Sequence, residues 1–257
     1  MSFAGFATPP KGIPKSPTPF TFGIPQDEEA RLLELVKTAE VGAPSYYNTH
    51  ADAATGTFGL SRDWLVKARE HWLNDFDWAA QQEKLNRYPN FHMHVTTSDG
   101  QLFYLHFAAL FSQNPDANNR AVVFMHGWPG AWFEFGPMLD LLRQKYTPET
   151  LPFHVIVPSI PDYGFSKRPR GEDGLGKELT LDVATEAMNE LMKALGFNKY
   201  IAQGGDIGAI LAQVMAARFE ECVGFHRECP LSPLGIMTNI SGLQALMVKS
   251  QSVFHET

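Results

Sequence analysis

The pattern of apolar and polar positions predicts an α/β protein. Short, continuous apolar runs lie at about 121–125, 153–157 and 200–204, and residues 222–228 are predicted to form one more strand. The first three are followed by a loop and a helical pattern, which is typical of strands buried on both faces of a parallel sheet. Upstream, residues 91–107 hold two β-rich runs joined through Asp99-Gly100, a dipeptide that favours a tight hairpin turn. The expected sheet therefore begins with a hairpin and continues in parallel strands.

Helical periodicity dominates the chain before this hairpin. One helix is predicted from Gln26, and a second begins at Ser61, whose hydroxyl can cap the helix. Apolar side chains of the second helix recur on one face: Trp64, Leu65, Ala68, Trp72 and Leu73. We expect this stripe to pack in a core. Residues 1–23 are rich in proline and hold little that could be buried, so they are predicted to form an extended tail with no fold of its own.

Composition and charge narrow the class of protein. The 257 residues are 44% apolar, and the net charge of −7 is spread along the chain without a basic run. A nucleic-acid or anionic-membrane partner is therefore not expected. No stretch approaches the ~18 apolar residues of a membrane span. The two cysteines, Cys222 and Cys229, lack the spacing of a metal site or a disulfide scaffold. We expect a soluble, cytoplasmic protein without metal or cofactor that acts on a small uncharged molecule.

Three unusual loops follow the predicted parallel strands. Ligands of such sheets bind beyond the carboxyl ends of the strands, so these loops are candidates for the site. They are HGWPG (126–130), PSIPDYGFS (158–166) and GGDIG (204–208). In the first, Gly127 and Pro129 favour an irregular backbone that can point a free N–H outward. The third has the G-x-D-x-G form of a nucleophile elbow, a sharp strand-to-helix turn that usually carries serine and here carries Asp206.

An aspartate at the elbow narrows the reaction. A carboxylate is ionised at pH 7 and can attack a saturated carbon to form an ester, whereas a serine needs a base. Water must then hydrolyse that ester through an oxyanion, which the backbone N–H groups of Trp128 and Ile207 are placed to stabilise. As an alternative, Asp206 could simply cap the following helix. That role would not account for the three glycines around it or for the HGWPG loop, so the nucleophile is favoured.

These motifs, in this order, resemble the epoxide hydrolases of the α/β-hydrolase fold, in particular the microsomal-type and fungal branch with its own N-terminal region. The segment WLNDFDWAAQQEKLNRYPNF (72–91) is similar to that region's W-x-x-x-F-D-W…E-x-x-L-N-x-[FY]-P-x-F pattern. HGWPG, PDYGFS and GGDIGA then follow in the family's order. The resemblance implies an α/β-hydrolase sheet preceded by a helical region. Its expected parts are an N-terminal region with the first hairpin (24–113), a partial core (114–230) and the start of a cap (231–257).

The resemblance also implies an epoxide-opening enzyme whose reactants are a small apolar epoxide and water. Asp206 would be the nucleophile, and the N–H groups of Trp128 and Ile207 would form the oxyanion hole. Residues expected to line the pocket or support its loops are His126, Gly127, Pro129, Tyr163 and Phe165. Two positions depart from the family pattern, which has serine in place of Ala131 and glycine in place of Asp162. Aspartate tolerates left-handed backbone geometry, so the expected fold is unaffected.

The chain after the elbow is short for this family. Only 51 residues follow Asp206, whereas the family adds a cap with two tyrosines, further strands with an acidic residue, and a histidine base. No tyrosine follows Tyr200, and the later histidines are His226 and His255. We interpret His226 as a structural strand histidine, and His255 lies two residues from the end. Glu228, at the end of the last predicted strand, is a candidate for an orienting acid.

Three functions stay open at this point. The first is an epoxide hydrolase, or the amino-terminal part of one. The second is a non-catalytic relative that binds small apolar molecules or forms only a stalled covalent adduct. The third is dehalogenation of alkyl halides by the same carboxylate chemistry, which the N-terminal region disfavours. A strand edge left unpaired after the last predicted strand favours self-association or a homodimer.

Overall fold

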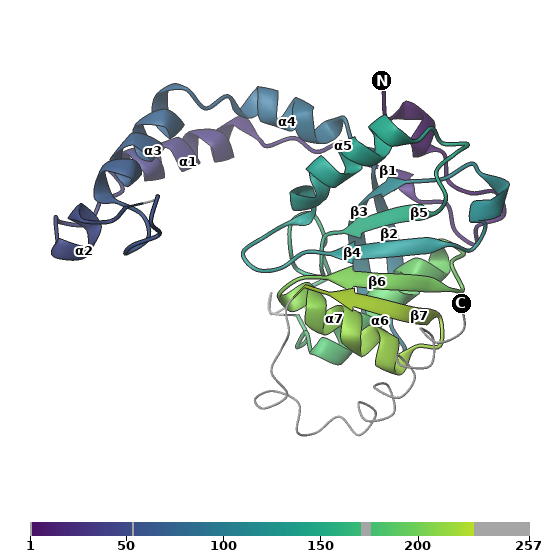
Figure 1. The fold of residues 1–257 in the computed structure, drawn as a ribbon. Helices are drawn as coiled ribbons and strands as arrows, with labels where there is room; N and C mark the ends of the chain where they lie inside the picture. Colours follow the sequence, from purple (N-terminus) through teal and green to yellow (C-terminus); the bar gives the residue numbers. More distant parts are fainter. Residues whose placement is uncertain (1, 53, 171–175, 229–257) are drawn as a thin grey trace. The chain divides into compact units, whose positions relative to one another are not determined.

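The computed structural model describes residues 2–52, 54–170 and 176–228, which divide into two compact units (Figure 1). Phe22–Asn86 form the smaller unit, and the other described residues form the larger one. This division differs from the expected N-terminal region at 24–113, because the hairpin belongs to the sheet of the larger unit. The expected start of a cap at 231–257 and His255 lie outside the described residues.

The larger unit is built on a seven-stranded sheet with the order β1-β2-β3-β5-β4-β6-β7. Its strands are β1 (Thr18–Pro19), β2 (Asn90–Thr96), β3 (Leu102–Leu110), β4 (Ala121–Met125), β5 (His154–Pro158), β6 (Tyr200–Gly204) and β7 (Cys222–Arg227). Pairing is antiparallel from β1 to β3 and between β3 and β5. It is parallel between β5, β4, β6 and β7. The predicted hairpin followed by parallel strands is thus confirmed.

Helices connect and cover these strands. In the larger unit they are η1 (Ala4–Ala7), η2 (Pro115–Ala117), η3 (Trp132–Phe135), α5 (Gly136–Lys145), α6 (Leu181–Ala194) and α7 (Ile207–Arg218). Helix α6 contacts α7 and β2, and α7 packs on β6 and β7. The smaller unit holds α1 (Gln26–Thr38), α2 (Tyr46–Thr49), α3 (Arg62–Asn74) and α4 (Trp78–Asn86), with α1 contacting α3.

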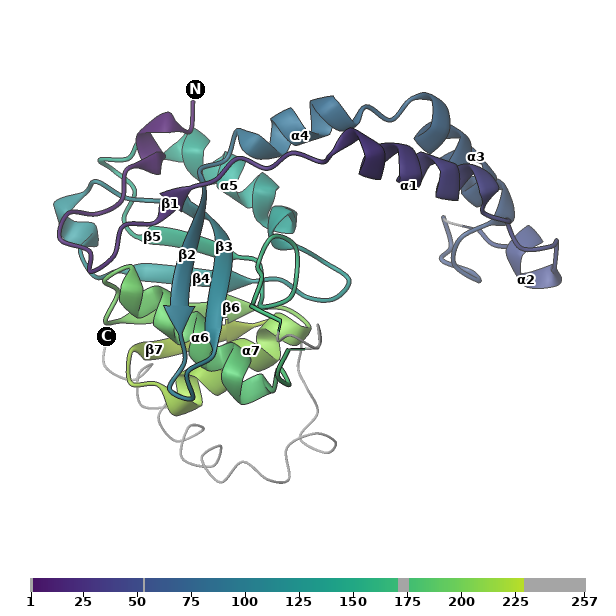
Figure 2. The same ribbon diagram turned by 180° about the vertical axis from the view of Figure 1, so that it is seen from behind.

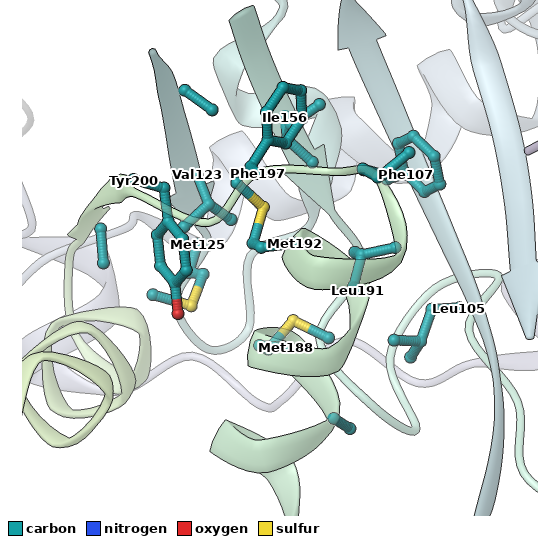
Figure 3. Close-up of a cluster of buried hydrophobic side chains, with 14 of the residues drawn as sticks. Leu105, Phe107, Val123, Met125, Ile156, Met188, Leu191, Met192, Phe197 and Tyr200 are labelled. Atoms are coloured by element: carbon teal, nitrogen blue, oxygen red, sulfur yellow. The ribbon is translucent and has the colours of Figure 1, made fainter. Parts of the chain in front are cut away.

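The hydrophobic core lies between the sheet and α6. Met188, Leu191 and Met192 recur at the spacing of one helix face, and all three are fully buried. Figure 3 shows them among Leu105 and Phe107 of β3 and other buried side chains of β4 and β5. Burying a side chain of this size contributes about 1.5–3 kcal/mol. This core holds the carboxyl ends of β4 and β6 in place, and the candidate site is built on those ends.

The proline-rich N-terminus is part of the larger unit and packs on the rest of it, so the prediction of a tail with no fold of its own is wrong. Phe3 and Phe6 are 5% and 2% exposed. Phe6 also accepts a hydrogen bond at its carbonyl oxygen from the N–H of Phe111, at 3.0 Å. Strand β1 pairs with β2 at the edge of the sheet (Figure 2). Two phenylalanines among the prolines supply the apolar surface, and a proline in β1 suits an edge strand because it has no N–H to pair.

The apolar stripe of α3 is not a core, contrary to prediction. Trp64 and Leu65 are 52% and 43% exposed, and no residue of α3 is buried. Trp72 instead stacks on Phe76 with ring centroids 4.7 Å apart and lies edge-on to Trp78. Periodicity identifies which side chains share a face, but it does not say whether another element covers that face. The predicted cap is present, since the Ser61 hydroxyl accepts from the N–H of Trp64 at 3.1 Å.

Candidate active site

The elbow joins β6 to α7 and presents Asp206 at the carboxyl end of the strand. Asp206 has φ 51° and ψ −121°, a backbone conformation that is uncommon outside glycine and costs about 1–3 kcal/mol. Its side chain is exposed. Asp206 occupies the N-cap position of α7, but its side chain does not make the hydrogen bond of a helix cap, so the geometry does not support a role limited to capping. Strain of this kind persists only where the surrounding structure enforces it.

The surrounding glycines are required by close backbone contacts. A Cβ at Gly204 would lie 2.2 Å from the carbonyl carbon of Gly208, and one at Gly208 would lie 2.1 Å from the carbonyl oxygen of Met125. A Cβ at Gly127 would lie 2.7 Å from the Cβ of Asp206. Any side chain at these positions would clash, so only glycine allows the elbow, the end of β4 and the HGWPG loop to meet.

Backbone N–H groups hold the carboxylate of Asp206. The N–H of Trp128 donates to Oδ1 at 2.8 Å. This bond, followed by the one from the N–H of Ile207, lowers the pKa of Asp206 below its ordinary value. The carboxylate is therefore ionised at neutral pH, and two donors from two different loops converge on it. Such a pair can also stabilise an oxyanion that develops on the same oxygen.

His126 links the HGWPG loop to the loop that follows β5 through two hydrogen bonds. Its side chain is fully buried, and its Nε2 accepts from the N–H of Ile160 at 3.1 Å. The proton must then be on Nδ1, which donates to the carbonyl oxygen of Gly127 at 2.9 Å. Burial lowers the pKa of His126, which keeps the ring neutral. The Tyr163 ring lies 5.4 Å from the His126 ring, centroid to centroid.

A cavity of about 810 Å³ opens over the elbow. Asp206 and Gly205 line it, and the HGWPG loop contributes Gly127, Trp128, Pro129 and Gly130. Its other lining side chains are Phe124, Phe135, Met138, Glu134, Gln203, His226 and Glu228. Trp128 is 66% exposed, so its indole is accessible to a molecule that enters the cavity. The polar side chains of the lining are the carboxylates, Gln203 and His226.

Three of the lining residues occupy one register across the sheet. Phe124 of β4 pairs with Gln203 of β6, which pairs with His226 of β7. His226 is exposed and lines the cavity, so the interpretation of a satisfied structural histidine inside its strand is not what the structure shows. Just after β7, Glu228 accepts at Oε1 from Gln203 Nε2 at 3.3 Å. Its backbone N–H also donates to the carbonyl oxygen of Gly204 at 3.2 Å.

Comparison with known proteins shows which family the chain resembles. A sequence model described as "Epoxide hydrolase N terminus" matches residues 17–135, and one described as "alpha/beta hydrolase fold" matches residues 120–225. Together the two models match residues 17–225, so the chain is similar over most of its length to the epoxide hydrolases of the α/β-hydrolase fold. Both the fold class and the resemblance seen in the sequence are thereby confirmed.

Individual epoxide hydrolases show the extent of the likeness. A Dothistroma septosporum protein named "Putative epoxide hydrolase" is 40% identical over 229 residues, which cover 89% of this chain and 53% of the relative. The solved structure of Aspergillus niger epoxide hydrolase matches with a TM-score of 0.78 and 38% identity, over 91% of this chain and 58% of that one. The juvenile hormone epoxide hydrolase of Bombyx mori matches with a TM-score of 0.65 and 27% identity. The chain spans about half the length of the relatives it matches.

The two departures from the epoxide hydrolase pattern have clear structural positions. Asp162 adopts φ 66°, the left-handed geometry that a glycine would take, and pairs with Arg168 at 2.8 Å. Ala131 is the N-cap residue of η3 and makes no side-chain cap hydrogen bond, which a serine there could supply. Neither residue lines the cavity.

Not every residue expected from the epoxide hydrolase resemblance reaches the cavity. Tyr163 and Phe165 are half-buried and do not line it, and the Phe165 ring lies 5.2 Å from that of His106. Conversely, the sequence argument overlooked Gln203 and Glu134. Gln203 carried a detectable signal, since it is a polar residue within the apolar run of β6, directly before the predicted GGDIG loop of the site.

Within residues 2–52, 54–170 and 176–228, no three side chains of His, Cys, Asp or Glu gather in a way that could hold a metal ion. None of the helices in those same ranges is both long and apolar enough to pass through a membrane.

Proposed function

We propose that this chain opens an epoxide through an alkyl ester on Asp206 and releases a vicinal diol when water hydrolyses that ester. The observation that carries the proposal is the Asp206 carboxylate at a strained elbow, with its Oδ1 held by the Trp128 N–H at 2.8 Å. The N–H of Trp128 holds Oδ1, and the N–H of Ile207 also bonds to the carboxylate. We assign Oδ2 as the atom that attacks.

In the first step, Oδ2 of Asp206 attacks an epoxide carbon while the bond from that carbon to the ring oxygen breaks. The ring oxygen takes a proton from solvent water and becomes a hydroxyl. A carboxylate with a lowered pKa is fully ionised for this attack, although it is correspondingly less basic. Strain in the three-membered ring compensates for that lower nucleophilicity.

In the second step, water attacks the ester carbon of Asp206, and the negative charge develops on Oδ1. This is the oxygen that the N–H of Trp128 already faces, and the N–H of Ile207 also bonds to this carboxylate. Each donor of this kind is worth a factor of about 10² to 10³ in rate. Collapse of the oxyanion releases the diol and restores the carboxylate.

The lining of the cavity favours a small apolar epoxide. Phe124, Phe135 and Met138 form its apolar wall, and the Trp128 indole is exposed at its edge. We also propose a cytoplasmic location, because the cysteine usage suits a reducing compartment. Self-association through β7, an edge strand of the described sheet whose Val223 is 55% exposed, is a further proposal.

Intact-protein mass spectrometry with a reactive aryl epoxide tests the proposal. The 257-residue protein should gain the mass of one epoxide on Asp206, whereas Asp206→Asn and Asp206→Ala should gain none. Asp116→Asn, at an exposed position of η2, is the matched control and should react as the wild type does. An adduct that forms equally on Asp206→Ala would refute the proposal.

Isotope labelling follows the second step. In a single turnover in ¹⁸O-water, the label should enter the Asp206 carboxylate, because water attacks the ester carbon. The first diol should carry an oxygen from the carboxylate. Label found directly in that first diol would show that water opens the ring itself. An alkyl chloride in place of the epoxide tests dehalogenation and should yield no adduct.

A further inference from the structure

Three carboxylates line the cavity over the elbow. Asp206 is the nucleophile, Glu134 belongs to η3 just after the HGWPG loop, and Glu228 directly follows β7. Among the described residues that line the cavity, none is a lysine or an arginine. The ion pairs formed within residues 2–52, 54–170 and 176–228 include neither Glu134 nor Glu228. The described wall of the cavity therefore carries negative charge that no ion pair neutralises.

Both glutamates lie close to the backbone of the site. Oε2 of Glu228 lies 3.4 Å from the position that a Cβ at Gly205 would occupy, and Gly205 directly precedes Asp206. Oε2 of Glu134 lies so close to Gly130 that a Cβ there would overlap with it. Both glutamates are exposed, so their charges act on a molecule that enters the cavity.

Basic side chains near these carboxylates do not neutralise them. Arg227 lies at the end of β7, but its Nη1 donates to Oε1 of Gln213 in α7 at 2.8 Å. His226 lines the cavity, and histidine side chains take up protons mainly below neutral pH. Burial lowers the pKa of His126, and the nearby Glu134 carboxylate opposes that shift only in part. Above neutral pH, the described lining therefore stays negative.

We propose that the cavity selects its epoxide by charge, with Glu134 and Glu228 as the residues that disfavour an epoxide bearing a carboxylate. Neutral and cationic epoxides are the substrates that it accepts. The inference rests on the proposed function, because the selection acts on ester formation at Asp206. An anionic group must approach three like charges, whereas an ammonium group is attracted by them. The indole of Trp128, 66% exposed, can also hold a cation over its face.

The size of the effect follows from Coulomb's law. Two unit charges about 8 Å apart, at an effective dielectric constant of about 40 to 80, change a rate by a factor of about two to six. Three carboxylates together should therefore slow an anionic epoxide by about 10- to 200-fold relative to a neutral one. Removing the charge of one glutamate should recover about two- to sixfold, and salt should weaken the whole effect.

The test uses the full 257-residue protein and three aryl epoxides of matched size. One methylene from the ring, they carry a methoxy, a trimethylammonium or a carboxylate group. The rate of adduct formation on Asp206 is followed by intact mass at pH 8 and low salt. The wild type should react about 10- to 200-fold more slowly with the carboxylate epoxide than with the methoxy epoxide.

Variants assign this selectivity to the two glutamates. Glu134→Gln and Glu228→Gln should each raise the ratio of carboxylate to methoxy rates about two- to sixfold, and the double variant should raise it about 4- to 36-fold. The trimethylammonium epoxide should show the opposite change. Comparing ratios between proteins cancels the intrinsic reactivity of each epoxide. Glu149→Gln, an exposed carboxylate that does not line the cavity, is the matched control and should leave the ratio unchanged.

Salt gives a second readout that needs no substitution. Raising the ionic strength from about 0.01 M to about 0.5 M should move the wild-type ratio towards that of the double variant. A wild-type ratio that neither salt nor the two substitutions alter would overturn the inference and leave the proposed function standing. A change of the same size in Glu149→Gln would do the same, because it would indicate an effect of net charge alone. Absence of an adduct with all three epoxides would overturn both proposals.

Discussion

Gly208 lies so close to Met125 that a Cβ on the glycine would be 2.1 Å from the methionine carbonyl oxygen. Gly208→Ala must therefore push the elbow away from the end of β4. We expect the variant to lose roughly 3 kcal/mol of folding stability and to form no adduct on Asp206. Urea denaturation and intact mass measure the two effects.

Gly224→Ala is the matched control for that substitution. A Cβ at Gly224 would make only ordinary contact, 4.0 Å from Cγ1 of Ile201. The free energy of unfolding should change by no more than about 0.5 kcal/mol. Equal losses in Gly208→Ala and Gly224→Ala would show that the close approach at the elbow is not what selects glycine.

Two buried histidines predict a loss of stability in mild acid. Burial lowers the pKa of His106 to about 3 and that of His154 to about 4, from an ordinary value of 6.5. Between pH 6.5 and about 4, the unfolded chain binds protons that the folded chain refuses, so stability is full above pH 6.5 and declines below it. Each histidine contributes a slope of up to about 1.4 kcal/mol per pH unit.

Denaturant titrations at several pH values measure this slope. His154→Asn should remove one histidine's share of it, and the variant's lower stability at pH 7 does not affect that comparison. A free energy of unfolding that stays constant from pH 6.5 to 4.5 would contradict the assignment of neutral, buried rings.

Tyr200 and Asn189 form a buried hydrogen bond between β6 and α6, with the hydroxyl donating to Oδ1 at 2.6 Å. Tyr200→Phe leaves a buried acceptor unpaired and should cost about 1–3 kcal/mol. Asn189→Leu should cost a similar amount, because it leaves the hydroxyl unpaired. The double variant should cost clearly less than the sum of the two. Strictly additive losses in urea denaturation would show that the bond is not formed.

Asp162 combines a strained backbone with an ion pair. Its φ of 66° favours glycine, while its carboxylate pairs with Arg168. Asp162→Gly relieves the strain and loses the pair, so stability should stay within about 0.5 kcal/mol of the wild type. Asp162→Ala keeps the strain without the pair and should lose about 1 kcal/mol. Thermal unfolding compares the two, and an alanine variant as stable as the glycine variant would contradict the backbone argument.

Much of the sheet and the elbow could be predicted because their physical requirements are local. Strands covered on both faces need continuous apolar runs, and β4, β5 and β6 appear as such runs in the sequence. The elbow needs small residues two positions before and two positions after Asp206, so the short motif G-x-D-x-G is enough to predict it. The loop that holds Trp128 could be identified as part of the site because it directly follows a predicted parallel strand.

The rest depends on contacts between distant segments. Gln203 and Glu228 meet because β7 pairs with β6, an order of strands that no local pattern states. Phe3 is buried by elements that come much later in the chain, so its neighbouring prolines gave a misleading prediction. The prediction that the stripe around Trp64 packs in a core was wrong for a different reason. An apolar helix face does not show whether another element packs on it.

The smaller unit begins and ends at one pair of hydrogen bonds. The N–H of Phe22 donates to Oδ1 of Asn86 at 3.1 Å, and Nδ2 of Asn86 donates to the carbonyl oxygen of Phe22 at 2.8 Å. The chain thus leaves the sheet after β1 and returns before β2 at two residues, Phe22 and Asn86, that are hydrogen-bonded to each other. An insertion closed in this way can gain, lose or exchange residues without altering the span between its flanking strands. The helices of Phe22–Asn86 are therefore free to diversify while the register of β1 on β2 stays constant.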